Sequence, residues 1–214
     1  LHANQEHGFF SVALSGGSTP KAVYEAMSKS EEIRALPWDK ILLFWSDERA
    51  VPATDPDSNY GMAMKFFFKE PFSKAQVFRM KAEVEHREHE AQEYQRLIKS
   101  NCFQGHLDLV YLGIGEDGHT ASLFPKTRAL LEKDALVVAN YIPEKSTFRM
   151  TFTYPLINSS KKILFLVLGK QKAPILKRIL TSKEDLSLPS TLVGTKASPA
   201  YFLCDQEAAS ELSL

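Results

Sequence analysis

The chain has 214 residues, of which 44% are hydrophobic, and this composition excludes a disordered protein. Its 26 basic and 26 acidic side chains balance, so no overall field draws it to nucleic acid or to an anionic membrane surface. No apolar run approaches the roughly 20 residues that span a bilayer, and two cysteines do not make a disulfide framework. We therefore expect a cytoplasmic protein with a small-molecule ligand that it recognises locally.

Short runs rich in Val, Ile, Leu and Phe alternate with stretches of helical period along the chain. This alternation predicts an α/β fold with a mostly parallel sheet flanked by helices. Because no Pro- or Ser-rich linker interrupts the pattern, residues 1–214 are expected to form a single domain. The expected strands are 9–14, 41–45, 77–80, 107–112, 136–140, 148–153, 163–168 and 201–204.

Helices are expected in three of the intervening stretches. Pro20 suits the first turn of a helix that runs to about Ser28, because the N–H that proline lacks has no partner there, and Thr19 is the expected cap. A second helix follows Ser58. A third covers 84–99, and its inner side is expected to hold Ala91, Tyr94 and Ile98.

The loop after the first strand has the sequence Ser15-Gly16-Gly17-Ser18-Thr19-Pro20. In parallel sheets the ligand lies beyond the carboxyl ends of the strands, and a helix N-terminus favours an anion such as phosphate. The Gly-Lys-Ser/Thr ending of a nucleotide-binding P-loop is absent, so a sugar phosphate is the expected ligand. An ordinary strand-to-helix turn would explain the same residues.

The second apolar run ends in three charged residues, Asp47-Glu48-Arg49. Arg49 is expected to hold a phosphate or carboxylate, or to polarise a carbonyl, with Asp47 or Glu48 orienting it. A surface turn with an ion pair is an equally simple interpretation.

The glycine-rich loop after the run 107–112 presents a carboxylate, Asp117, and an imidazole, His119, two residues apart. A neighbouring carboxylate can fix the tautomer of a histidine and support the charge that it gains as a general base. The loop also contains Gly-x-Gly-x-x-Gly, but Pro125 interrupts the segment where a dinucleotide-binding domain has a long helix. We therefore expect neither a nicotinamide cofactor nor a metal.

Two basic residues lie at or near later apolar runs, Arg149 at the start of Arg149-Met150-Thr151-Phe152-Thr153 and Lys172 in Gly169-Lys170-Gln171-Lys172-Ala173. Both are expected to meet a phosphate held by the first loop. Either residue alone would be read as a solvated charge.

Together these segments resemble the glucosamine-6-phosphate isomerase/6-phosphogluconolactonase family, in its lactonase form. The resemblance implies a three-layer Rossmann-like fold and hydrolysis of 6-phospho-D-glucono-1,5-lactone to 6-phosphogluconate in the oxidative pentose phosphate pathway, without a cofactor. It also implies that an N-terminal segment is missing from the chain. The matching segments include Asp57-Ser58-Asn59-Tyr60 and Leu112-Gly113-Ile114-Gly115-Glu116-Asp117-Gly118-His119-Thr120-Ala121-Ser122-Leu123-Phe124-Pro125, besides the polar segments quoted above.

The resemblance also assigns roles to residues. The family's catalytic histidine falls on His119, its aspartate on Asp117 and its arginine on Arg49. The implied substrate and phosphate site consists of Gly16, Gly17, Ser18, Thr19, Asp47, Arg149 and Lys172.

Three other functions stay open from the sequence. One is a deaminase or isomerase of an amino sugar phosphate, although relatives of that kind have a tyrosine where Arg49 stands. Another is a non-catalytic sugar-phosphate-binding module. The third is a hydrolase with Ser15 or Ser18 as nucleophile, although no Gly-x-Ser-x-Gly segment occurs. The protein is expected to be a monomer or a weak homo-oligomer.

Overall fold

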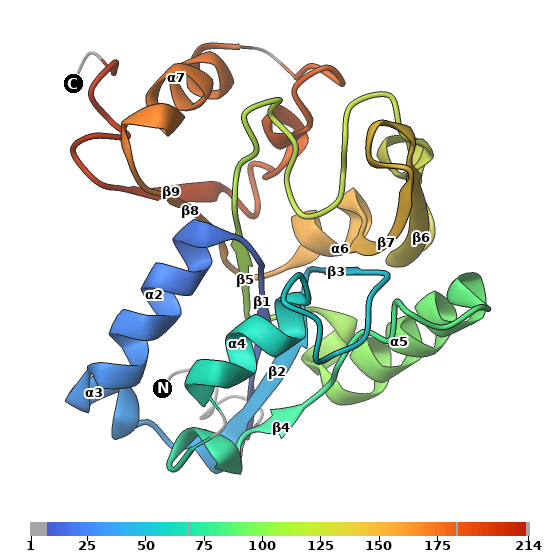
Figure 1. Cartoon of the computed structure of the whole chain (residues 1–214), viewed down its shortest axis with the longest axis vertical. Coiled ribbons are helices and arrows are strands. Elements are labelled where there is room, and N and C mark those ends of the chain that lie inside the picture. The colour runs from blue at the N-terminus through green and yellow to red at the C-terminus, as the bar shows by residue number, and fades with distance from the viewer. Residues whose placement is uncertain (1–7, 68, 183, 213–214) are drawn as a thin grey trace.

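The computed structural model describes residues 8–67, 69–182 and 184–212. Its main sheet has six strands in the order β4-β2-β1-β5-β8-β9, and every strand pair in it is parallel (Figure 1). This confirms the predicted α/β class with a mostly parallel sheet. The strands are β1 (Phe10–Leu14), β2 (Ile41–Trp45), β4 (Gln76–Val77), β5 (Leu109–Leu112), β8 (Ile163–Val167) and β9 (Ala200–Cys204).

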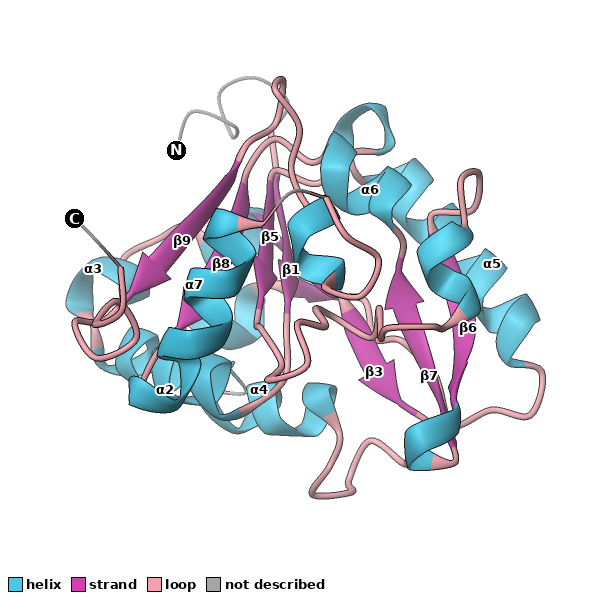
Figure 2. Cartoon of the chain, turned by 90° about the horizontal axis from the view of Figure 1, so that it is seen from above, coloured by secondary structure: helices cyan, strands magenta, loops and turns pink. Residues whose placement is uncertain are grey.

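Helices cover both faces of this sheet. Because parallel crossovers are right-handed, the helices that connect strands toward β4 lie opposite those that connect strands toward β9, as Figures 1 and 2 show. No described helix is long and apolar enough to cross a membrane. The connections toward β4 contain α2 (Ser18–Lys29), α3 (Glu31–Arg34) and α4 (Asn59–Phe67). The connections toward β9 contain α5 (Arg87–Asn101), α6 (Tyr154–Ser159) and α7 (Ala173–Thr181).

Short 3-10 turns lie between these helices and strands. They are η1 (Trp38–Lys40), η2 (Phe72–Lys74), η3 (Phe103–Gly105), η4 (Arg128–Leu131), η5 (Pro143–Lys145), η6 (Lys170–Lys172) and η7 (Pro189–Leu192).

A second, antiparallel sheet of three strands, β3-β7-β6, lies beside the main one (Figure 2). It consists of β3 (Asp47–Arg49), β6 (Val137–Ile142) and β7 (Thr147–Phe152). The sequence prediction was wrong here, because it grouped 136–140 and 148–153 with the parallel strands and left 47–49 in a loop. The turn 143–146 between β6 and β7 is too short for a parallel crossover, which takes about a dozen residues, so these strands can only form a hairpin.

The start of α2 also differs from the prediction. The helix begins at Ser18 and its cap is Gly17, with φ 105°, so Thr19 lies inside the first turn and is not the cap. Proline is tolerated two positions further in, as the third helical residue, because none of the first four N–H groups of a helix has an intrahelical partner. The earlier start places the hydroxyls of Ser18 and Thr19 on the first turn. On α5 the buried residues are Ala91, Tyr94 and Ile98, as predicted.

The direction in which the chain moves across the main sheet reverses between β1 and β5. In such sheets the ligand lies at this switch point, beyond the carboxyl ends of the two strands. Tyr24, fully buried on α2, holds the loop after β1: its hydroxyl accepts from Ser15 N at 2.9 Å and donates to Ser15 O at 3.0 Å. The fold therefore fixes the polar loop where it leaves the strand.

Candidate active site

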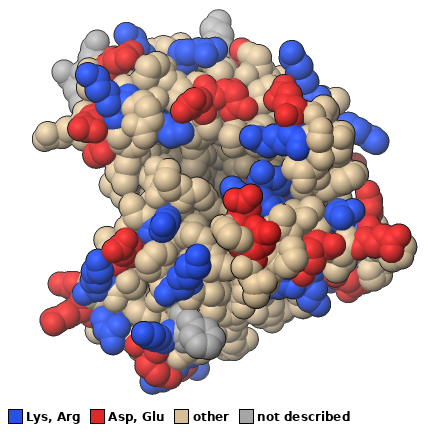
Figure 3. Space-filling view, viewed as in Figure 1, with Lys and Arg blue, Asp and Glu red and all other residues tan. Residues whose placement is uncertain are grey.

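A pocket of about 240 Å³ lies at this switch point, and Figure 3 shows the hollow with basic side chains along its rim. Its walls come from the loop after β1, from β3 and β7, from the loop after β5, and from the turns η5 and η6. Four basic side chains and one carboxylate line it, so this neutral chain gathers positive charge locally, at the pocket. The predicted site residues in its lining are Gly16, Gly17, Ser18, Thr19, Asp47, Arg49, His119, Arg149 and Lys172.

His119 is held by Asp117, the predicted site residue that lies just behind the lining. Asp117 Oδ1 is 2.5 Å from His119 Nδ1 and accepts from the backbone N of His119 at 3.1 Å. Partial burial would raise the pKa of Asp117, but the hydrogen bond and the charge of His119 outweigh it and hold that pKa below its usual range. An ionised Asp117 only accepts, so in the neutral form of His119 Nδ1 carries the proton and Nε2 keeps the lone pair.

The glycines of this loop leave room for that pair. A Cβ added to Gly115 would lie 2.0 Å from His119 Nδ1 and 2.6 Å from Asp117 Oδ1. Gly118 has φ 80°, and its carbonyl accepts from Ser190 N at 3.0 Å and from Ser190 Oγ at 2.8 Å. The loop is thus shaped around the His119–Asp117 pair and fixed to η7.

The charged strand β3 divides its side chains between two faces. Successive side chains of a strand alternate, so Asp47 and Arg49 face the pocket while Glu48 points the other way. In the antiparallel ladder Arg49 pairs with Arg149 of β7, which places both guanidinium groups on one wall. Of the two carboxylates expected to orient Arg49, Asp47 or Glu48, the second is ruled out, because the strand turns the Glu48 carboxylate toward α4.

Glu48 is 1% exposed and accepts four hydrogen bonds, from Arg49 N, Ser58 Oγ, Asn59 N and Tyr60 N, at 2.7 to 3.0 Å. Burial raises the pKa of Glu48, and the four donors offset part of this effect. The carboxylate satisfies the first N–H groups of α4 and so attaches that helix to β3.

The stability of the wild type relative to Glu48→Gln is expected to fall as the pH rises from about 4.5. The pKa of Glu48 is 4.5 in the unfolded chain and higher in the folded protein. Between these two pKa values the folded state binds more protons than the unfolded state, so the free energy of unfolding falls as the pH rises. Urea unfolding of both proteins between pH 4 and 7 measures the difference. Glu25→Gln is the matched control with the opposite sign, because the hydrogen bond from Lys29 lowers the pKa of Glu25. A pH-independent difference for Glu48→Gln would contradict the burial effect.

Asp47 is 5% exposed and connects three segments of the site. Its carboxylate accepts from Ser122 Oγ at 2.6 Å and from Asn59 Nδ2 at 3.1 Å. Asn59 also lies under the first loop, since a Cβ added to Gly16 would be 1.7 Å from Asn59 Oδ1. Asp47 and Asn59 therefore fix the first loop, β3 and the histidine loop relative to one another.

The two arginines on this wall have unused hydrogen-bonding capacity. Arg49 Nη1 donates to Asp57 O at 2.5 Å, whereas the Nε atoms of Arg49 and Arg149 are buried and have no hydrogen-bond partner among the described residues. Burial lowers the pKa of Arg149, the charge of Asp47 raises it, and that of Arg49 lowers it again. Two adjacent cations with free donors form a wall that suits an anion or a developing oxyanion.

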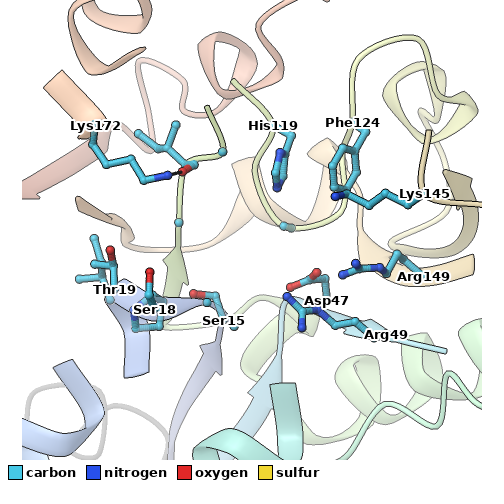
Figure 4. A pocket seen from close by; sticks show the side chains of 18 residues that line it. Ser15, Ser18, Thr19, Asp47, Arg49, His119, Phe124, Lys145, Arg149 and Lys172 are labelled. Carbon is cyan, nitrogen blue, oxygen red and sulfur yellow. Dashed lines mark hydrogen bonds between the residues drawn. The ribbon is translucent and has the colours of Figure 1, made fainter. Parts of the chain in front are cut away.

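The opposite side of the pocket presents a second group of hydrogen-bond donors. The first turn of α2 opens into the pocket with no side-chain cap, and Lys172 Nζ lies nearby, donating to Ile114 O at 2.8 Å. Figure 4 shows Lys172 with Ser18 and Thr19 on one side, the arginines with Asp47 on the other, and His119 between them. Arg149, expected beside Lys172, thus lies beside Arg49.

Two lining residues with polar side chains, Lys145 and Ser15, were missing from the predicted set. Lys145 on η5 reaches the pocket from the β6–β7 hairpin, and no sequence signal marks it, because an exposed lysine in a turn looks like a solvated charge. Ser15 is 2% exposed, and within the part of the chain that the structure describes its hydroxyl has no hydrogen-bond partner. Ser15 therefore forms no nucleophile–base pair with His119. Among residues 8–67, 69–182 and 184–212, no group of three or more His, Cys, Asp or Glu residues could hold a metal ion.

Known proteins and a protein-family model are similar to this chain over most of its length. A family model described as "Glucosamine-6-phosphate isomerases/6-phosphogluconolactonase" matches residues 1–202. A 6-phosphogluconolactonase of Chlamydia pneumoniae is 39% identical over 96% of this chain and 79% of its own length, and one of Nostoc is 37% identical over 99% and 88%.

Solved structures agree with these matches. A 6-phosphogluconolactonase from Thermotoga maritima has a TM-score of 0.77 at 30% identity, over 95% of this chain and 89% of its own. A monomeric glucosamine-6-phosphate deaminase has a TM-score of 0.78 at 24% identity, over 98% and 92%, which shows a shared fold alone.

Proposed function

Since the chain belongs to the glucosamine-6-phosphate isomerase/6-phosphogluconolactonase family, we propose that this enzyme hydrolyses 6-phospho-D-glucono-1,5-lactone to 6-phosphogluconate, a step of the oxidative pentose phosphate pathway. Relatives named 6-phosphogluconolactonase at 37–39% identity support this substrate. The observation that carries the proposal is a carboxylate-held imidazole in the same small pocket as two separate cationic sites.

The phosphate group binds at the first turn of α2. There the backbone N–H groups of Ser18 and Thr19, their hydroxyls and the Lys172 ammonium supply donors to a dianion. With the phosphate fixed at this side, the lactone ring extends past His119 toward Arg49 and Arg149. Binding energy from the phosphate is used to place the carbonyl carbon beside the imidazole.

His119 acts as a general base. Its Nε2 takes a proton from a water molecule whose oxygen adds to the lactone carbonyl carbon, and the carbonyl oxygen becomes an oxyanion that Arg49 and Arg149 stabilise. The imidazolium, supported by the ionised Asp117, then gives its proton to the ring oxygen as the carbon–oxygen bond of the ring breaks. The resulting acid ionises to 6-phosphogluconate. No step requires a cofactor, because a lactone is already an activated ester.

A hydrolysis assay with freshly generated 6-phosphogluconolactone, run beside the unphosphorylated lactone, tests this function. Acid release is followed by pH-stat, and the spontaneous rate is subtracted. We expect a strong preference for the phosphorylated substrate. Hydrolysis at the spontaneous rate despite binding of 6-phosphogluconate would indicate a non-catalytic module, and ammonia release from glucosamine 6-phosphate would indicate a deaminase.

The Lys172→Met variant is expected to raise the KM for the phosphorylated lactone about tenfold or more, since a hydrogen bond to a charged group contributes roughly 1.5–3 kcal/mol. Its kcat/KM for the unphosphorylated lactone should stay within about twofold of wild type, because that substrate has no group at this site. Lys170→Met, on the same turn but outside the pocket lining, is the matched control. An equal effect on both substrates would contradict the phosphate assignment.

A further inference from the structure

Phe124 is buried against the imidazole of His119. The two ring centroids are 3.9 Å apart and the planes are inclined by 20°, so the rings are stacked face to face. Phe124 is only 3% exposed, yet it lines the pocket (Figure 4). The hydrolysis described above makes no use of this ring.

The backbone between the two residues is shaped to bring the rings together. Ala121 has φ 48°, a left-handed conformation that is uncommon for a residue with a side chain. The chain reverses there, and Leu123 N donates to Thr120 O at 2.9 Å across the turn. The reversal carries Phe124 back over His119.

The turn is also attached to the rest of the site. Ser122, at its tip, donates from Oγ to Asp47 at 2.6 Å and from its backbone N to Thr151 Oγ1 at 3.1 Å. The carbonyl of Ser122 accepts from Asn140 Nδ2 at 2.9 Å. Three hydrogen bonds, one to each strand of the second sheet, therefore hold the segment that carries Phe124, so its ring has a fixed position.

The hydrogen bond to Asp117 fixes His119 at one atom, Nδ1, and the imidazole could still rock about that point. A flat partner on one face removes this freedom, because rocking would push the imidazole into the phenyl ring. Building on the proposed function, we propose that Phe124 is a positioning residue that sets the plane of the His119 imidazole and so the direction in which Nε2 meets the attacking water. The ring also keeps water from one face of the imidazole.

The test compares Phe124→Leu with Phe124→Tyr. Leucine keeps an apolar side chain without a flat face, so we expect kcat to fall about tenfold or more with KM within about twofold, because small misplacements of reacting groups are costly. Tyrosine keeps the flat face and should restore most of kcat. Phe165→Leu is the matched control: Phe165 is fully buried and stacked on Phe202 at 4.7 Å, but it does not line the pocket. It should lower the melting temperature and leave kcat unchanged.

A spectroscopic measurement checks the stacking apart from activity. In the wild type the ring current of Phe124 should shift the His119 carbon-bound proton resonances upfield, and this shift should disappear in Phe124→Leu and persist in Phe124→Tyr. If Phe124→Leu does not fold, Phe124→Met, which is also without a ring, takes its place. Unchanged kcat in a folded ringless variant, or equal losses with leucine and tyrosine, would overturn the proposal.

The outcome for His119 separates this inference from the function itself. If His119→Gln keeps full turnover, the general-base assignment fails whatever Phe124 does. If His119→Gln loses turnover while Phe124→Leu keeps it, the positioning role alone is refuted.

Discussion

Replacing His119 by alanine is expected to lower kcat by about 10²- to 10⁴-fold, the usual contribution of a general acid–base residue. Both proton transfers of the proposed hydrolysis pass through this imidazole, and no other described titratable side chain is hydrogen-bonded to Asp117 in its place. Initial rates from a pH-stat with freshly generated lactone, corrected for spontaneous hydrolysis, measure the loss.

Product binding is the control for this variant. The phosphate site on α2 and the two arginines remain intact in His119→Ala, so the Kd for 6-phosphogluconate should change by no more than about threefold in a calorimetric titration, because those contacts carry the affinity. Wild-type turnover in the variant would refute the general-base role. Loss of both turnover and binding would instead indicate a collapsed pocket.

Most of the main sheet could be predicted from the sequence because its inner strands are apolar on both faces. The run 41–45 is buried at every position, and a short run that is apolar throughout is typical of a strand covered on both sides. In the second sheet, β6 and β7 were expected as strands from their apolar runs, whereas β3 gave no comparable signal. Strand β3 is Asp47-Glu48-Arg49, and three charged residues do not look like a strand until their alternation is matched with a partner. That partner, Arg149 to Thr151, is about a hundred residues away.

The same limit applies to the site. The histidine loop and the loop after β1 could be predicted to converge, because parallel strands bring their carboxyl ends to one edge. The place of Arg149 beside Arg49, and of Lys145 at the rim, depends on how the antiparallel hairpin folds over the pocket. Glu48 shows most clearly how the sequence and the structure differ. Its neighbours in the sequence suggest an active-site carboxylate, but its face of the strand places it against α4, where it accepts hydrogen bonds from the first N–H groups of the helix.

Gly115→Ala is expected to lower kcat at least about 100-fold, an effect of the size that misplacement of a catalytic group produces. The added methyl carbon would lie 2.0 Å from His119 Nδ1 and 2.6 Å from Asp117 Oδ1, closer than any real contact, so the pair must leave its wild-type position, and we expect its hydrogen bond to be lost or misdirected. Without it, the tautomer and the direction of Nε2 are no longer fixed. Steady-state kinetics measure the loss, and the imidazole resonances report the broken hydrogen bond.

Gly113→Ala is the matched control, because it adds the same methyl group two residues away in the same loop and that methyl meets nothing within 4 Å. Both substitutions reduce backbone freedom alike, and neither glycine has a positive φ, so backbone strain does not separate them. A kcat at least tenfold lower in Gly115→Ala than in Gly113→Ala is therefore attributable to the collision with the His119–Asp117 pair. Equal kcat values in the two variants would mean that turnover does not depend on that hydrogen bond, and the orienting role of Asp117 would have to be abandoned.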